Sequence, residues 1–232
     1  IFRETALGEG SYTLRARVPG GDDEPEKGFD GILDEDQRIN LNTASREVLL
    51  RLPRVTEEMA DSILDWRDED PFSHFLGAED FYYRGLEPPY QAKNAPFEIL
   101  EELLLVRGVT EEIFKAVEPF VTIYTDGKVN LNTATREVLT AVGMSQGLVN
   151  KVLRFRNGTD DLSLTADDQS FPSLGSAEQQ LNAVDPLTPQ EAAEMTNLVA
   201  QNLLKVDSQV FRIAAQGKVR QGKITRSVEA IV

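Results

Sequence analysis

The sequence predicts an α+β protein in which a large all-α domain is inserted between segments that form a sheet. A twelve-residue motif occurs twice, at 39–50 and 129–140, with nine identical positions, and such a repeat indicates a duplicated structural unit. Apolar residues follow each copy at helical spacing, whereas 11–18 alternates as a strand does and 210–219 and 223–232 are typical of two strands.

These patterns divide the chain into four parts. Residues 1–38 and 205–232 form the sheet-containing body, and residues 39–160 form the inserted helical domain. Residues 161–204 hold an acidic loop followed by a helix, and the sequence does not assign them to either domain. The helix is predicted at 189–204, because Thr188, Pro189 and Glu191 match a helix start with a capping box.

Each copy of the motif predicts a helical hairpin. Asn42 and Asn132, each followed by Thr-Ala, are predicted to start the first helix, because an Asn or Thr oxygen can accept free N–H groups there. Pro53 to Thr56 ends the first helix of the first hairpin, and Gly143 to Ser145 ends that of the second.

A third hairpin is predicted between the two copies. Its first helix would run from Pro96 to Val106 and its second from Glu111 to Val117, with Arg107 to Thr110 as the turn. The inserted domain would then hold three tandem helix-hairpin-helix units.

Composition restricts the function classes. Net charge is −15 and there is no cysteine, which excludes disulfides, thiolate zinc sites and cysteine nucleophiles. An acidic chain repels nucleic acid and anionic membranes. Residues 205–232 carry six basic and two acidic residues, which favours a solvated strand face, with a polyanion site as the alternative. No apolar run is long enough to span a bilayer.

Enzymatic chemistry has little support, so we predict no catalytic and no cofactor-binding residues. The one histidine, His74, lies between Phe72 and Phe75, and a lone histidine in an aromatic loop is more often structural than catalytic. Residues 217–223 resemble a phosphate-binding loop, but Ile224 occupies its Ser/Thr position.

Calcium is the metal that the acidic loops favour. Asp160, Asp161, Asp167 and Asp168 fall in one connection, and carboxylate oxygens on a bendable loop suit this ion. The spacing does not match an EF-hand, and a solvated acidic loop is the alternative.

Helix-hairpin-helix units also bind DNA in many proteins, through backbone N–H groups of a glycine-containing turn. Here the first turn lacks glycine, and two turns are flanked by acids. DNA binding is therefore the alternative function rather than the preferred one.

Two resemblances follow from these motifs. Ile39 to Arg67 resembles the helix-hairpin-helix domain of ComEA-type DNA uptake proteins, through Asn-Leu-Asn-Thr-Ala and the closing Ile-Leu-Asp-Trp-Arg. Over Gly31 to Ala134 the chain is similar to the K-type minor pseudopilins of the type II secretion system. The matching motifs are Asp34-Glu-Asp, Asp65-Trp-Arg-Asp68, Gly77-Ala-Glu-Asp80, Pro88-Pro-Tyr90, Lys93-Asn-Ala-Pro-Phe97, Val106-Arg-Gly-Val109 and Gly127-Lys-Val-Asn-Leu-Asn132.

The second resemblance implies a pilin-like body, with an N-terminal helix on an antiparallel sheet, around the helical insertion. It implies a non-enzymatic subunit that caps a periplasmic pseudopilus and contacts I-type and J-type minor pseudopilins, with calcium in several relatives. Residues 1–9 would be the end of a helix whose upstream part anchors the protein in the inner membrane. Phe2 and Leu7 on it would face the sheet or a partner.

Overall fold

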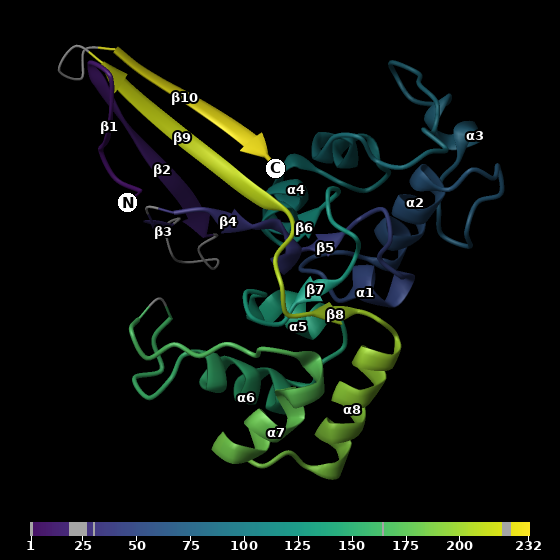
Figure 1. Cartoon of the computed structure of the whole chain (residues 1–232). Coiled ribbons are helices and arrows are strands. Elements are labelled where there is room, and N and C mark those ends of the chain that lie inside the picture. Colours follow the sequence, from purple (N-terminus) through teal and green to yellow (C-terminus); the bar gives the residue numbers. More distant parts are fainter. Residues whose placement is uncertain (1, 19–26, 30, 164, 220–223) are drawn as a thin grey trace. The chain divides into compact units, whose positions relative to one another are not determined.

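The chain divides into two units, which we describe separately. The structure, a computed structural model, describes residues 2–18, 27–29, 31–163, 165–219 and 224–232. The first unit consists of Ile1–Asp36 and Ser208–Val232, and the second of Gln37–Asp207. Residues 161–204 therefore lie in the second unit, with the helices (Figure 1).

The first unit is an antiparallel sheet. Four strands follow the order β1-β2-β9-β10, while β3 pairs with β2 and β4 pairs with β9. The strand bounds are β1 Thr5–Leu7, β2 Gly10–Val18, β3 Lys27–Phe29, β4 Leu33–Asp34, β9 Phe211–Val219 and β10 Ile224–Ile231. The three predicted strands are thus present, and the predicted turn at 220–222 lies outside the described residues.

The prediction of a helix over residues 1–9 is wrong for the described part of that segment. Thr5–Leu7 is strand β1, and Leu7 pairs with Gly10 across a tight turn. Gly8 in that turn has φ +58°, a left-handed conformation that glycine adopts without a steric cost. The pairing of Thr5, Ala6 and Leu7 with β2 thus replaces the expected helix.

The duplicated motif builds two similar modules in the second unit. The first consists of β5 (Ile39–Asn40), α1 (Arg46–Leu50) and α2 (Glu57–Arg67). The second consists of β7 (Val129–Asn130), α5 (Arg136–Ala141) and α6 (Gln146–Arg156). β5 pairs in parallel with β6 (Val121–Thr122), and β7 pairs in parallel with β8 (Leu204–Lys205).

The region between the modules is less helical than the sequence predicts. It holds α3 (Asp80–Tyr83), α4 (Glu111–Val117) and two 3-10 helices, η2 (Leu100–Leu105) and η3 (Glu118–Phe120). The first helix expected at 96–106 is therefore only the single 3-10 segment η2. Its N-cap position is Ile99, which offers no side-chain acceptor, whereas Thr110 caps α4.

Two helices complete the second unit. α7 (Leu174–Val184) was not predicted, and α8 (Pro189–Ala200) begins at the predicted capping box but ends four residues early. The expected last residue, Leu204, is instead in β8, where it pairs with Val129. Figure 1 shows α7 and α8 beside α6.

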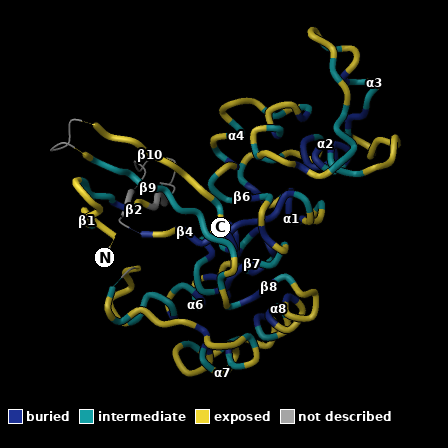
Figure 2. Tube along the Cα trace, turned by 45° about the horizontal axis from the view of Figure 1, so that its top comes forward, coloured by how far each residue is buried: buried dark blue, intermediate teal, exposed yellow. Residues whose placement is uncertain are grey.

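The hydrophobic core lies in the second unit. Leu41 and Leu131, one from each copy of the motif, are fully buried, as are Leu49 and Leu139. Figure 2 shows this buried chain around α1, α6 and β7. Strand β9 in the first unit has no buried residue, and most of β10 is exposed. Within the described residues, no helix is long and apolar enough to cross a membrane.

Candidate functional site

The repeated Asn-Leu-Asn-Thr-Ala motif fixes a distant phenylalanine in each module. Asn42 donates from Nδ2 to the Phe97 carbonyl (3.0 Å) and accepts the Phe97 N–H at Oδ1 (2.7 Å). Asn132 makes the same pair of bonds with Phe171, at 3.0 and 2.7 Å, and also donates to the Val206 carbonyl (2.8 Å). Both phenylalanines are buried. The motif is therefore a clamp that holds a later segment of chain.

This arrangement corrects the prediction that Asn42 and Asn132 cap helices. Ser45 and Thr135 are the N-caps of α1 and α5, through side-chain bonds from the N–H groups three residues on. A cap must directly precede its helix, and the two asparagines lie three residues too early.

A basic residue closes each module. Arg67 at the end of α2 donates to the carbonyls of Leu41 and Ala44, and Arg156 at the end of α6 donates to the Ala134 carbonyl. Burial lowers the pKa of Arg156 to about 10. These two arginines serve the fold and are not available to bind a polyanion.

The turns between paired helices share one backbone feature. Arg54, Gly108 and Gly143, each two residues before the N-cap of the second helix, have positive φ of 61°, 83° and 113°. Arg54 forms an ion pair with Glu112, and Arg107 forms one with Glu58.

Acidic side chains surround two of these turns. Glu57, Glu111 and Glu112 are exposed and Glu58 is half-buried at the starts of α2 and α4. Their charges oppose a phosphate backbone at the point where a helix-hairpin-helix unit would contact DNA. The structure therefore gives no support to the DNA-binding alternative.

Three of the four aspartates predicted to bind calcium meet at one hydroxyl group. Oγ1 of Thr165 lies 3.4 Å from Asp160, 2.8 Å from Asp167 and 3.1 Å from Asp168. Hydrogen bonds from the Thr159 side chain and N–H hold the pKa of Asp167 well below its ordinary value. Asp161 takes part through its backbone, with φ +57° and a carbonyl that accepts a bond from Asn157.

The other acidic segment, Asp34 to Asp36, binds residues 208–212, where the chain re-enters the first unit. Asp36 Oδ2 accepts from the N–H groups of Gln209 (2.6 Å) and Val210 (3.1 Å). Asp34 accepts from the Ser208 hydroxyl, and the buried Glu35 pairs with Arg212. These bonds join the two chain segments at which the second unit is inserted.

The two predicted interface residues lie on the first unit and reach solvent. Leu7, on strand β1, is 69% exposed, and Phe2 is 38% exposed. Among the described strands, β1 is at the edge of the sheet, and an edge strand with apolar side chains is suited to a partner.

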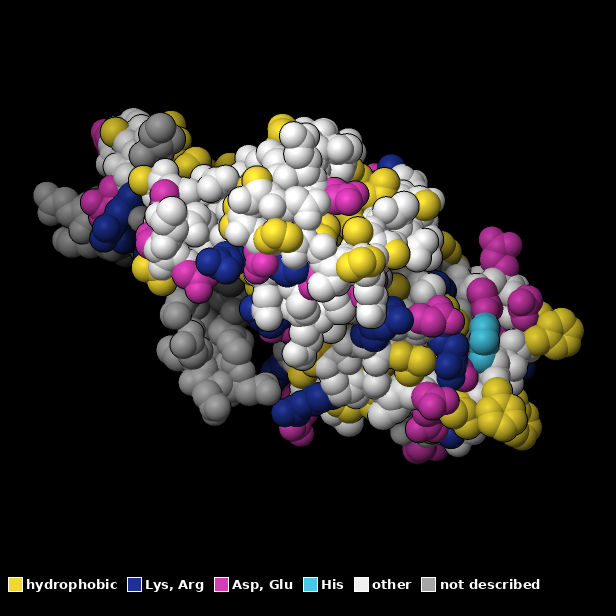
Figure 3. All heavy atoms as spheres, turned by 90° about the horizontal axis from the view of Figure 1, so that it is seen from below, with side chains coloured by type: hydrophobic (Ala, Val, Ile, Leu, Met, Phe, Trp, Pro, Cys, Tyr) yellow, Lys and Arg dark blue, Asp and Glu magenta, His cyan; other side chains and the backbone are white. Residues whose placement is uncertain are grey.

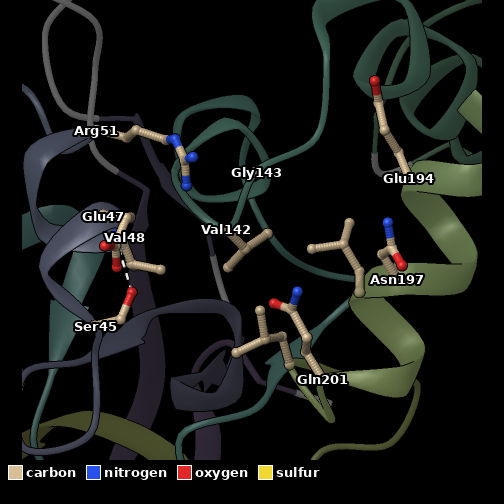
Figure 4. Close-up of a pocket in the computed structure, with 11 residues that line it drawn as sticks. Ser45, Glu47, Val48, Arg51, Val142, Gly143, Glu194, Asn197 and Gln201 are labelled. Atoms are coloured by element: carbon tan, nitrogen blue, oxygen red, sulfur yellow. Dashed lines mark hydrogen bonds between the residues drawn. The ribbon is translucent and has the colours of Figure 1, made fainter. Parts of the chain in front are cut away.

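A pocket of about 400 Å³ lies between α1, α5 and α8 (Figure 4). Arg51 on its wall donates to the Ala141 carbonyl, and Glu194 accepts from the Ser145 N–H. Arg51 and Glu194 are therefore already hydrogen-bonded to backbone groups of the second module.

His74, which the sequence favours as a structural residue, contacts the buried Asp65. The imidazole Nδ1 of His74 lies 2.5 Å from Asp65 Oδ1, and the backbone N–H of His74 donates to the same oxygen at 2.9 Å. The hydrogen bond with Asp65 raises the pKa of His74. The sequence signal was Asp65-x2-Asp68-x5-His74, at the end of a helix, which sequence reasoning did not consider.

A family model matches the central part of the chain. Residues 34–126 match the model described as type II secretion system (T2SS), protein K. The match begins in β4 and covers the first module and the region between the two modules, ending just before β7.

Two curated relatives carry the same name. The chain is 39% identical over 83 residues to type II secretion system protein K of Aeromonas hydrophila, and 26% identical over 168 residues to that of Pectobacterium carotovorum. These matches cover 34% and 70% of this chain, but only 25% and 46% of the relatives. The chain thus spans between a quarter and a half of the curated relatives' length.

A solved structure shares the fold. A chain of the GspK–GspI–GspJ complex from the type 2 secretion system of enterotoxigenic Escherichia coli aligns with a TM-score of 0.64 and 21% identity. The alignment covers 97% of this chain and 75% of that one. Together, the family model, the curated names and this neighbour support the type II secretion system protein K family.

Proposed function

We propose that this chain belongs to the type II secretion system protein K family and is a non-enzymatic minor pseudopilin that caps the pseudopilus and supports protein export across the outer membrane. The observation that carries this proposal is the protein K match over 34–126, within a fold that aligns over 97% of the chain. The three helix pairs of the insertion are then helix-hairpin-helix units with a structural role.

The insertion gives this role a physical basis. Gln37–Asp207 leaves the sheet after β4 and returns before β9, and these two strands pair with each other. A head of this size fits at the end of a fibre and would clash between tightly stacked subunits. An open head-to-tail assembly grows without limit unless a subunit lacks the next docking surface.

The proposed partners are the I-type and J-type minor pseudopilins. The structural neighbour is described as a complex of GspK with GspI and GspJ. On this chain, Phe2 and Leu7 supply exposed apolar surface at a sheet edge, which supports a contact there. We place this interface on the sheet unit rather than on the helical head.

We also propose that this chain is the periplasmic part of a protein anchored in the inner membrane by an upstream helix, because the sheet has strands that no other layer covers among the described residues. Strand β9 has no buried residue and β10 is exposed over 224–230, and a sheet gains most of its stability by packing one face on another layer. An N-terminal helix upstream of this chain would supply that layer and the anchor.

Calcium at the Asp160–Asp168 loop is part of the proposal. Three carboxylates approach the single Thr165 hydroxyl, which can donate only one proton, so a cation would reduce their mutual repulsion. Millimolar calcium should raise the melting temperature, and Asp167→Asn should reduce that rise. An unchanged melting temperature of the unsubstituted chain would refute calcium binding.

Complex formation tests the function. The chain is mixed with the soluble I-type and J-type pseudopilins of the same genome, and the mass is measured by size-exclusion chromatography with light scattering. We expect a 1:1:1 complex, weakened by Leu7→Glu and unchanged by Phe81→Glu, a control at a 96% exposed position of the helical unit. Absence of a complex in every mixture would refute the assembly role.

A further inference from the structure

The end of α2 and the loop after it bring together a set of potential metal ligands. One ligand atom from each of Asp65, Asp68 and His74 lies within 4.8 Å of the other two. Figure 3 shows the histidine at the surface, with acidic, basic and hydrophobic side chains around it. The group is separate from the Asp160–Asp168 loop, which follows α6.

Acidic oxygens without partners gather at this position. Asp65 is fully buried, and its Oδ2 has no hydrogen-bond partner among the described residues. The same holds for Oδ1 of Asp68 and for both carboxylate oxygens of Glu79, which is 8% exposed. Buried carboxylate oxygens are normally bonded, because an unpartnered one costs free energy. Such a set is expected where a cation completes the structure.

The backbone is adapted to the buried carboxylate. A Cβ at Gly77 would lie 1.9 Å from Asp65 Oδ2, so only glycine lets the loop pass this closely. The same loop brings His74 into contact with the Asp65 carboxylate, nine residues earlier in the chain. The side chain of His74 is 42% exposed, which leaves a path by which an ion can enter from solvent.

We propose that Asp65, Asp68 and His74 form a binding site for a first-row transition-metal dication, with Zn²⁺ as the best fit. An imidazole nitrogen with two carboxylates suits Zn²⁺ or Mn²⁺, whereas Ca²⁺ and Mg²⁺ take oxygen ligands. The ion replaces the proton shared between His74 and Asp65. Water fills the remaining positions. The site cross-links the end of α2 to its loop, and it does not depend on the proposed role in secretion.

The ligand set can be tested directly on the full chain, purified without a histidine tag. Co²⁺ is the spectroscopic probe, because its visible absorption reports nitrogen and oxygen ligation, and Zn²⁺ should displace it. The one tryptophan, Trp66, is adjacent to Asp65, so its fluorescence should change on binding. Free Zn²⁺ at about 100 times Kd should raise the melting temperature by roughly 5–10 °C.

Matched variants decide whether the named residues bind the ion. Asp68→Asn and His74→Gln should each weaken Zn²⁺ binding by at least about tenfold. Glu69→Gln removes the same charge at the adjacent exposed position and should leave Kd unchanged. Asp167→Asn, in the other acidic loop, should also leave it unchanged.

Three results would overturn the proposal. The first is the absence of a Co²⁺ band together with an unchanged melting temperature in Zn²⁺. The second is an equal effect of Asp68→Asn and Glu69→Gln on the affinity for Zn²⁺, and the third is a Zn²⁺ affinity that His74→Gln does not alter. Circular dichroism of each variant without metal verifies that it is folded, so a loss of binding reports on the site.

Discussion

The two asparagine clamps allow a prediction in which the chain supplies its own comparison. Asn42→Ala removes two hydrogen bonds to Phe97, and Asn132→Ala removes three, to Phe171 and Val206. Each bond contributes about 1 kcal/mol, and a buried backbone group left unpaired adds to the loss. We expect a loss of about 2–3 kcal/mol for Asn42→Ala and about 3–4 kcal/mol for Asn132→Ala.

Urea unfolding measures both values, with Trp66 fluorescence and far-ultraviolet circular dichroism as probes. Asn197→Ala is the control, because Asn197 is exposed on α8 and no side-chain bond is found for it among the described residues. It should be neutral or slightly stabilising, since alanine favours helix. Losses below about 0.5 kcal/mol for both clamp variants, or a larger loss for Asn42→Ala, would refute the clamp as described.

Three further predictions concern the helices of the second unit. Arg54→Gly should raise the free energy of unfolding by roughly 0.5 kcal/mol, because the relief of left-handed backbone strain exceeds the loss of an exposed ion pair. Gly143→Ala should lower the free energy of unfolding by about 1 kcal/mol, because alanine would be strained at this positive φ. Urea titration measures both values, and changes of the same sign would contradict the prediction. The ammonium of Lys151 holds the pKa of Glu191 below its ordinary value of 4.5. The ionised Glu191 carboxylate therefore stabilises the folded state fully above about pH 4.5, and this contribution is lost as the pH falls through the lowered pKa. Glu191→Gln should therefore lower the melting temperature at pH 7 and flatten its decline toward pH 3, and an unchanged slope would argue against this linkage. Gly147→Ala should lower the melting temperature, because its Cβ would lie 2.5 Å from Glu191 Oε1, and a melting temperature equal to that of the unsubstituted chain would show that the helices have room to adjust.

Local signals were sufficient to predict the elements with strong caps and periodicity. Thr56 and Thr188 begin α2 and α8 as expected, and β9 and β10 lie where the alternating pattern placed them. The helix expected at residues 1–9 is wrong, because it rested on the family resemblance alone, whereas Thr5–Leu7 pairs with β2.

Long-range pairing explains most of what the sequence did not reveal. β7 and β8 are only two residues each and lie some 75 positions apart, so neither has a pattern to detect. The Asn132 bonds to Phe171 and Val206 span 39 and 74 positions, and the motif therefore resembled a helix cap. His74 was interpreted alone because nothing in the sequence shows that the chain turns back to Asp65.

The central claim is that the helical unit marks the end of a fibre. The most direct measurement is immunogold electron microscopy of purified pseudopili, with an epitope inserted after the exposed Phe81. We predict gold at one end of each fibre, and none when the I-type and J-type pseudopilins are absent. Gold distributed along the shaft would contradict the account, because a subunit carrying residues 37–207 would then stack within the array.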